Sequence, residues 1–298
     1  MDQPRKATPV YDRAAEDVGN IVEFGHVNVF VPDQQLATMF YVSTLGFTRD
    51  PFLMTSTDNM WINVGQQQFH LPTGPAQVLR GVTGIVIPDL DPLRQRIKRT
   101  TQKLAGTRFA ATERDGAIHL TCPWGNRVRV HTPSDTFGPV GLGIVYVELD
   151  APIGSAGGIA KFYREVLHAP AHVGHDAAGK FTTIGCGVNT RLIYRETSAT
   201  LPLYDGNHIQ ITLADFSGPH ERLLARALVT EESDAHQYRF QCVTEADSGD
   251  VLVEVEHEVR SMRHPLFDRQ LVNRNPLQSN RQFAPGRESW AWSQPLDG

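Results

Sequence analysis

Three histidines lie in stretches of the chain where apolar and polar residues alternate. His26 is followed by the alternating Val27 and Val29, and His70 and His131 belong to later runs of the same kind. Because successive side chains of a strand point to opposite faces, all three histidines fall on the polar faces of their predicted strands. Imidazole suits zinc, copper, iron and nickel, so three neutral histidines with open positions could hold a catalytic metal. The alternative is that each histidine only makes hydrogen bonds within a pocket.

A second polar set lies nearer the end of the chain. It comprises four residues of two predicted strands, namely His208, Glu254, Glu256 and Glu258. Three ionised carboxylates buried on one strand face would repel one another. We therefore expect a cation or an arginine beside the glutamates, for example Arg260 or Arg195. The alternative is a solvated strand face on which the glutamates pair with arginine and histidine.

The strands that position these residues recur in four similar units. Short β-branched runs begin about sixty residues apart, at Gly25, Gly81, Gly143 and Asn207. Apolar residues three and four apart then predict helices over 35–45, 92–104, 158–167 and 219–228. Two or three short β-rich stretches bounded by glycine follow each helix. The predicted unit is therefore strand, helix, and two or three further strands.

The first and third units share a finer signature, because MFYVSTLGF and KFYREVLHA carry Phe-Tyr and Leu at the same spacing. With HVNVFVPD and CPWGNRVRVH, these motifs make the sequence resemble the vicinal oxygen chelate superfamily, which contains glyoxalases, extradiol dioxygenases and bleomycin or fosfomycin resistance proteins. The resemblance covers about residues 22–275. It implies an α+β fold in which four βαβββ units pair into two curved, cup-shaped mixed β-sheets with helices outside.

If neighbouring units pair, the chain divides into two glyoxalase-like domains. The first would span 21–139 and the second 140–275, with the polar stretch SDTFGPVG at their junction. An N-terminal arm, 1–20, and a C-terminal tail, 276–298, would lie outside the cups. We expect Trp290 and Trp292 to pin this tail to the surface.

The resemblance also implies roles for residues of the first cup. His26 fills the first-strand position from which the family binds metal, and His70 and His131 would join it as ligands. Arg129 stands where the family usually has a metal-binding acid after a G-N turn, and it is a candidate catalytic residue. The matching first-strand position of the second unit holds Val82 instead of a ligand.

In the second cup, the resemblance to extradiol dioxygenases implies iron bound by one histidine from each first strand and a glutamate from the last strand. His208 and either Glu254 or Glu256 match two of these ligands, whereas the third unit has Ile144 in the remaining position. A histidine of the following loop could supply the missing imidazole, from among His168, His172 and His175. We take Glu254 as the candidate ligand and Glu256 as the candidate catalytic residue.

The chemistry implied by the resemblance is capture of two adjacent substrate oxygens by a divalent metal. The four-unit layout favours an oxidoreductase, a metal-dependent extradiol dioxygenase-like oxygenase acting on a small oxygenated molecule such as a catechol. Fe(II) is the favoured metal, with zinc, nickel or manganese as alternatives. A glyoxalase-like lyase or isomerase, with Glu256 moving a proton, is a second hypothesis. A metal-free binding protein is a third, favoured by Val82 and Ile144.

Composition excludes several other classes of protein. The chain has 298 residues, 40% of them hydrophobic, which argues against a largely disordered protein. Its 28 basic and 33 acidic residues leave no basic excess for binding nucleic acid. No signal-peptide core or membrane-spanning apolar run is present, and the three cysteines form no C-x-x-C pair. We expect a cytoplasmic protein with a small-molecule substrate and no membrane or nucleic-acid partner, and a homodimer is left open.

Overall fold

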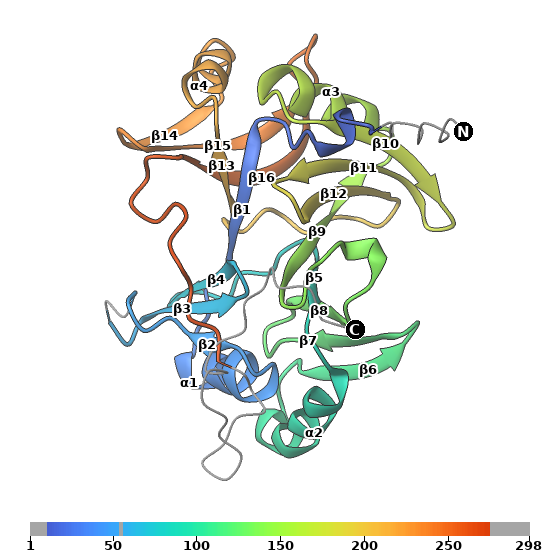
Figure 1. Ribbon diagram of the computed structural model, residues 1–298, viewed down its shortest axis with the longest axis vertical. Coiled ribbons are helices and arrows are strands. Elements are labelled where there is room, and N and C mark those ends of the chain that lie inside the picture. The colour runs from blue at the N-terminus through green and yellow to red at the C-terminus, as the bar shows by residue number, and fades with distance from the viewer. Residues whose placement is uncertain (1–10, 54–55, 275–298) are drawn as a thin grey trace, which may run out of the picture.

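The computed structural model describes residues 11–53 and 56–274 (Figure 1). The expected tail 276–298, with Trp290 and Trp292, and the first ten residues of the expected arm lie outside the described residues. No helix within the described ranges is long and apolar enough to cross a membrane.

Four βαβββ units follow one another along the chain, as the sequence predicts. The first contains β1 (Ile21–Asn28), α1 (Gln34–Ala37) running into the π-helical η2 (Thr38–Thr44), β2 (Thr48–Arg49), β3 (Asn59–Val64) and β4 (Gln67–Pro72). The second contains β5 (Gly81–Val86), α2 (Leu90–Thr100) with η3 (Thr101–Leu104), β6 (Ala110–Arg114), β7 (Ala117–Thr121) and β8 (Arg127–His131). The third contains β9 (Gly143–Pro152), α3 (Ala156–Val166), β10 (Ala171–Asp176), β11 (Gly179–Cys186) and β12 (Thr190–Thr197). The fourth contains β13 (His208–Leu213), α4 (Ser217–Leu224), β14 (Val229–Asp234), β15 (Gln237–Thr244) and β16 (Val251–Ser261); the short helices η1 (Ala14–Glu16) and η4 (Asp135–Phe137) lie outside the units.

Local sequence explains where the helices start and which face they bury. The Asp33 side chain accepts hydrogen bonds from the backbone N–H groups of Gln35 and Leu36 at the start of α1, and Asp89 caps α2 in the same way. The aromatic pairs of the first and third units are fully buried against the sheets. Amphipathic helices therefore cover the outer faces of the sheets.

The strands form two eight-stranded mixed sheets. The first sheet has the order β14-β15-β16-β13-β1-β4-β3-β2, and the second has the order β10-β11-β12-β9-β5-β8-β7-β6. The first unit therefore shares a sheet with the fourth, and the second shares a sheet with the third. The expectation that the first unit pairs with the second and the third with the fourth is wrong, because neither 21–139 nor 140–275 contains a complete sheet. From here on, the first cup is that of the first sheet and the second cup is that of the second sheet.

Glycines in the first strands explain how these pairs fit together. A Cβ atom at Gly25 of β1 would lie 1.7 Å from Oε1 of Gln210 on β13. A Cβ atom at Gly84 of β5 would lie 2.1 Å from the Tyr146 ring on β9. The absence of a side chain therefore makes room for the partner residue across each central strand pair. Period-two alternation predicts which face of the sheet each side chain lies on, but it does not predict which strand lies next to which. The pairing of the units therefore cannot be predicted from this pattern.

The first and second units, and likewise the third and fourth units, contact each other through their helices. Figure 1 shows α1 and α2 together in the lower half of the molecule, and α3 and α4 together in the upper half. Thr44 of η2 and Thr100 of α2 are hydrogen-bonded at 2.8 Å, and Arg222 of α4 donates to the carbonyl of Val166 at the end of α3. The two sheets are thus joined by packing between two pairs of helices.

Residues 262–274, which we call the strap, run from the end of β16 to the first unit (Figure 1). Arg269 Nη2 lies 2.8 Å from Oδ2 of the fully buried Asp50 side chain. Asn273 donates to the carbonyl of Gly65, and Asn63 donates to the carbonyl of Val272. Burial alone would raise the pKa of Asp50, but the hydrogen bond from Arg269 and two backbone N–H groups hold it below its usual value. The strap therefore fastens the fourth unit to the first.

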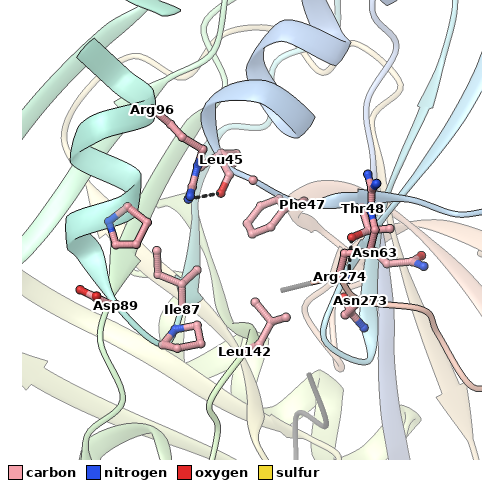
Figure 2. Close-up of a pocket in the computed structure, with 13 residues that line it drawn as sticks. Leu45, Phe47, Thr48, Asn63, Ile87, Asp89, Arg96, Leu142, Asn273 and Arg274 are labelled. Atoms are coloured by element: carbon pink, nitrogen blue, oxygen red, sulfur yellow. Dashed lines mark hydrogen bonds between the residues drawn. The ribbon is translucent and has the colours of Figure 1, made fainter. Parts of the chain in front are cut away.

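The end of the strap also borders a small apolar cavity of about 30 Å³ between the first two units (Figure 2). Phe47, Ile87 and Leu142 line it, and the Arg96 guanidinium at its side donates to the carbonyl of Leu45 at 2.9 Å. Burial lowers the pKa of Arg96 to about 10. The cavity holds no group of metal-ligating side chains, and we interpret it as a packing defect.

Replacing Asp50 with asparagine is expected to lower the free energy of unfolding by about 3 kcal/mol, because it leaves Arg269 without its buried counter-ion. The folded-state pKa of Asp50 is depressed, so its contribution is complete above about pH 4 and is lost as the pH falls through the folded-state value. Urea unfolding at pH 7 and pH 3 checks both points. Asp58→Asn, at an exposed position, is the matched control. Equal stability of Asp50→Asn and the parent protein at pH 7 would contradict the role of the strap.

Candidate metal centre in the first sheet

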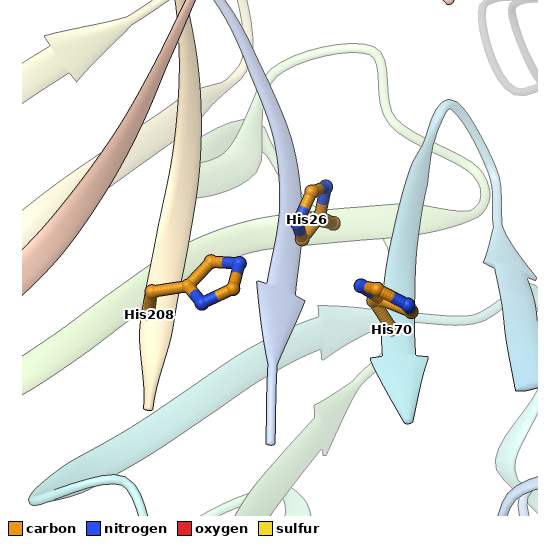
Figure 3. A group of neighbouring side chains, drawn as sticks. All are labelled: His26, His70 and His208. Atoms are coloured by element: carbon orange, nitrogen blue, oxygen red, sulfur yellow. The ribbon is translucent and has the colours of Figure 1, made fainter. Parts of the chain in front are cut away.

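Three histidines meet on three neighbouring strands of the first sheet (Figure 3). His26 is on β1, His70 on β4 and His208 on β13, and one ring nitrogen of each lies within 4.8 Å of those of the other two. The His26 ring centroid is 5.7 Å from that of His70 and 5.6 Å from that of His208. Their ring nitrogens could therefore hold a metal ion together.

Two of these histidines have a free nitrogen in a buried position. His26 is 2% exposed and His208 is 6% exposed, and the Nε2 atom of each makes no hydrogen bond with any described residue. Burial holds the pKa of His26 well below its usual value, so this imidazole is neutral at physiological pH. A buried polar atom without a partner is costly, and a bound ligand would satisfy both nitrogens.

His70 is held differently. Its ring stacks on Trp61 with the centroids 3.8 Å apart. Its Nε2 lies 2.7 Å from Asn59 Oδ1, and its Nδ1 lies 2.7 Å from Asn28 Nδ2. Because the amide oxygen can only accept a hydrogen bond, Nε2 carries the proton and Nδ1 is the acceptor. Burial, followed by the charge of neighbouring groups, lowers the pKa of His70 to about 3.

A buried carboxylate completes the cluster. Glu258 Oε2 lies 3.3 Å from His208 Nε2, and Glu258 also forms ion pairs with Arg239 at 2.8 Å and Arg260 at 2.6 Å. Its Oε1 atom nevertheless accepts no well-oriented hydrogen bond. Burial alone would raise the pKa of Glu258, but the close approach of His208 and the charge of Arg260 hold it below its usual value. The carboxyl group is therefore ionised and available as an oxygen ligand.

Strand register shows that these four residues occupy equivalent positions in the two units. Asn28, two residues after His26, lies opposite His70 in the parallel pair of β1 and β4. Gln210, two residues after His208, lies opposite Glu258 in the parallel pair of β13 and β16. The first unit thus contributes His26 and His70, and the fourth unit contributes His208 and Glu258 from the equivalent positions.

The other two glutamates of β16 lie outside this set. Glu256 accepts a hydrogen bond from Arg239 at 2.6 Å, and its Oε1 lies 3.5 Å from His208 Nδ1 rather than Nε2. Glu254, the glutamate that we expected to bind metal, lies beyond the paired end of β13 and receives a 3.4 Å hydrogen bond from Gln241. Arg239 and Arg260 meet the expectation that arginine would accompany the glutamates.

The remaining two candidates lie in the other sheet. His131 and Arg129 are on β8, and the structure does not bring either to His26 or His70. His131 Nε2 lies 2.9 Å from the hydroxyl of Tyr146, and Arg129 Nη1 lies 3.3 Å from the same oxygen. The expected shared cup of His26, His70 and His131 is therefore wrong, because β8 pairs with β5 rather than with a strand of the first unit.

Comparison with known proteins supports the fold. No family model matches the sequence, and no curated protein matches it. Glyoxalase I from Zea mays is similar in structure with a TM-score of 0.56 at 14% identity, over 80% of this chain and 92% of that one. A proposed dioxygenase from Bacillus subtilis subsp. subtilis str. 168 has a TM-score of 0.54 at 14% identity, over 83% of this chain and 87% of that one.

The chain has the vicinal oxygen chelate fold. Within this fold, the pairing of units explains why two first strands lack a histidine. Val82 on β5 and Ile144 on β9 are in the second sheet, while His26 and His208 are both in the first. Strand register corrects the second of these matches, because Tyr146 rather than Ile144 occupies the position equivalent to His208. No histidine from the loop before β10 is therefore needed to complete the first cup.

The residues present fit a divalent metal in this vicinal oxygen chelate fold. Neutral imidazole and carboxylate are the donors of iron, zinc, nickel and manganese sites. Nε2 of His26, Nε2 of His208 and Oε1 of Glu258 make no well-oriented hydrogen bond with a described residue, although Oε1 of Glu258 also lies 2.6 Å from the Arg260 guanidinium. Sequence reasoning placed Glu258 in the acidic stripe but did not select it as a ligand, and it missed Arg239 altogether. A signal for Glu258 exists in the strand pairing. His70 lies opposite the residue two positions after His26, and Glu258 lies opposite the residue two positions after His208. This equivalence can be recognised only when the register of the strands is known.

Proposed function

We propose that the protein is a metal-dependent oxygenase acting on a small molecule with two adjacent oxygens, such as a catechol. The site is the cup formed by the first and fourth units. The observation that carries this proposal is a set of buried donors. The Nε2 atoms of His26 and His208 make no well-oriented hydrogen bond with a described residue, and they lie beside the ionised Glu258 carboxylate, which Arg239 and Arg260 hold in place. Two histidines and one carboxylate with open positions beside them are typical of non-haem Fe(II) oxygenases. A bound divalent metal would supply Lewis-acid polarisation of both substrate oxygens.

His70 is positioned to accept a proton from the substrate, and because burial lowers its pKa to about 3 its imidazole is neutral at physiological pH. Asn59 fixes its tautomer, so the lone pair of Nδ1 faces the cluster side occupied by the Asn28 amide. His70 is also more exposed than His26 and His208, so that a substrate hydroxyl can reach it. A substrate hydroxyl that replaced Asn28 at Nδ1 would give up its proton to a positioned general base.

Two arginines lie where they can stabilise the negative charge that forms when the substrate hydroxyl loses its proton. Arg239 on β15 joins Glu256 and Glu258, and Arg260 on β16 pairs with Glu258. Their guanidinium groups are part-buried, where fixed positive charges stabilise an oxyanion more strongly than in water. We infer that Arg239 and Arg260 favour the ionised form of a diol substrate.

A glyoxalase-like lyase or isomerase is the second candidate. It is favoured by the position of His70, whose ligand atom lies within 4.8 Å of those of His26 and His208. If His70 displaces Asn28 and becomes a fourth ligand, fewer positions remain open and the substrate alone can fill them. Proton transfer would then fall to Glu256, as the sequence suggested.

Metal-dependent turnover separates these candidates. Protein stripped with a chelator would be loaded without oxygen with Fe(II), Zn(II), Ni(II) or Mn(II), and tested on a panel of catechols and of α-hydroxy ketones. We expect Fe(II) to restore oxygen uptake with a catechol. Isomerisation of a ketone by the Zn(II) or Ni(II) protein without oxygen uptake would favour the second candidate, and failure to bind any of the four metals would contradict both.

A further inference from the structure

The second sheet carries an open cleft of about 420 Å³ that the proposed function does not use. It lies over β8, β9 and β12 and is bordered by η4. Strand register shows which residues replace the candidate metal ligands here. Val82, Arg129, Tyr146 and Ile193 occupy the positions equivalent to His26, His70, His208 and Glu258. In this cleft an arginine, a tyrosine and two apolar residues therefore occupy the positions that hold the candidate metal ligands in the first sheet.

One arginine of the cleft has no ion-pair partner among the described residues. Arg129 forms no ion pair with any described residue, and its buried Nε atom has no hydrogen-bond partner. Glu148, an acid within the cleft, is neutralised by Arg195 at 3.2 Å. The other lining acid, Asp135, is exposed at the rim, and the exposed Arg191 adds a further positive charge. An unpaired, part-buried guanidinium presents two parallel N–H donors, the geometry that a carboxylate matches.

Two polar groups fix the orientation of this arginine. The Tyr146 hydroxyl accepts from Arg129 Nη1 at 3.3 Å and lies 2.9 Å from His131 Nε2. Burial lowers the pKa of His131 to about 4 and raises that of Tyr146, so both are neutral at physiological pH. The charge available to a ligand is therefore that of Arg129, and it is held in place before binding.

Aromatic and aliphatic side chains form one wall of the cleft. Phe137 of η4 stacks with Tyr146 at an interplanar angle of 27° and lies 4.8 Å from the His131 ring, between centroids. Val145 and Ile193 add aliphatic surface. A cleft that combines apolar walls with a few convergent polar groups is typical of small-molecule sites. These aromatic and aliphatic walls favour a planar hydrocarbon body over a sugar or a phosphate ester.

We propose that the second cup is a metal-independent binding site for an aromatic carboxylate. The carboxylate lies on the guanidinium of Arg129, and the ring lies between Phe137 and Ile193. The site is separate from the histidine cluster, because β8, β9 and β12 all belong to the second sheet. The chain therefore has two different ligand sites built from the same repeated unit.

Calorimetric titration with benzoate in the presence of a metal chelator tests this proposal. We expect a dissociation constant of about 1 mM or tighter for wild-type protein, and weaker binding of the uncharged benzamide. Arg129→Gln should weaken benzoate binding about 10- to 100-fold, since it removes a charge-assisted hydrogen-bond pair. Arg129→Lys, which keeps the charge without the fork, should be intermediate. Arg114→Gln, at an exposed position of the same sheet, is the matched control.

Further variants separate this site from the first cup. Ile193→Trp should fill the cleft and remove benzoate binding, while His26→Ala should leave it unchanged. Circular dichroism and unfolding curves would show that each variant is folded. The proposal is overturned if benzoate does not bind, if Arg129→Gln binds it as wild type does, or if binding requires metal or His26.

Discussion

Replacing His208 with alanine is expected to abolish metal binding and, with it, catalysis. His208 Nε2 is a buried, unpartnered nitrogen that lies 3.3 Å from the Glu258 carboxylate, so its loss removes a donor at the centre of the site. Loss of groups that merely support metal ligands costs 10- to 100-fold in affinity, and loss of a ligand should cost at least about 100-fold. Metal content after dialysis and titration with Fe(II) under nitrogen measure this effect.

The control for this prediction is an exposed histidine of the second sheet. His175→Ala on β10 removes an imidazole of the same kind and should leave metal content and affinity unchanged. Glu258→Gln should behave like His208→Ala, because it replaces a charged oxygen donor with an amide. Normal metal binding in both His208→Ala and Glu258→Gln, in protein that remains folded, would mean that the cluster is only a buried hydrogen-bonding network.

Replacing His70 with glutamine is expected to lower kcat by about 10²- to 10⁴-fold while metal content is retained. This is the range that a positioned general base contributes. The reason is geometric, since Nε2 of His70 is satisfied by Asn59 and only its Nδ1 faces the cluster. Steady-state rates across a range of pH, together with metal analysis of the same preparation, distinguish a lost base from a lost ligand.

Two results would change the interpretation of His70. A fall in metal content in His70→Gln would assign His70 as a fourth ligand and support the lyase or isomerase. An unchanged kcat with normal metal content would remove His70 from the mechanism. Asn59→Asp is an informative companion variant, because it keeps an acceptor for Nε2 and should preserve the tautomer.

The repeated unit was predictable from the sequence because its signals are local. Spacing of apolar residues located the four helices, and alternation sorted side chains such as His26 and His208 onto the correct faces. Pairing of the units was not predictable in this way, since it depends on contacts between segments far apart in the chain. The complementarity of Gly25 with Gln210, and of Gly84 with Tyr146, is steric and becomes apparent only once β1 faces β13 and β5 faces β9.

The choice of ligand on β16 shows the same limit on a smaller scale. Glu254, Glu256 and Glu258 are equivalent under a period of two, so alternation cannot select one of them. Register with β13 excludes Glu254, which lies past the paired end of that strand. Contacts then separate the other two, because Glu258 lies 3.3 Å from Nε2 of His208 whereas Glu256 lies 3.5 Å from its Nδ1. Alternation within β16 therefore identified the row of glutamates, whereas the candidate ligand among them could be identified only from the contacts with β13.

The pairing also accounts for the uneven distribution of histidine among the first strands. The sequence suggested two cups, each with one missing ligand at Val82 or Ile144. The structure instead collects His26 and His208 in one sheet, and Val82 and Ile144 in the other. The metal donors are thus all in the first sheet, and the second sheet has an arginine and apolar side chains at the equivalent positions.

The central claim is that the first cup holds a divalent metal on His26, His208 and Glu258. Crystals of the protein loaded with Mn(II) or Fe(II), with diffraction recorded on both sides of the metal absorption edge, test it most directly. We predict one anomalous peak about 2.0–2.3 Å from Nε2 of His26, Nε2 of His208 and a carboxylate oxygen of Glu258. The absence of a peak beside His26, His208 and Glu258, or a peak in the second cup, would contradict it.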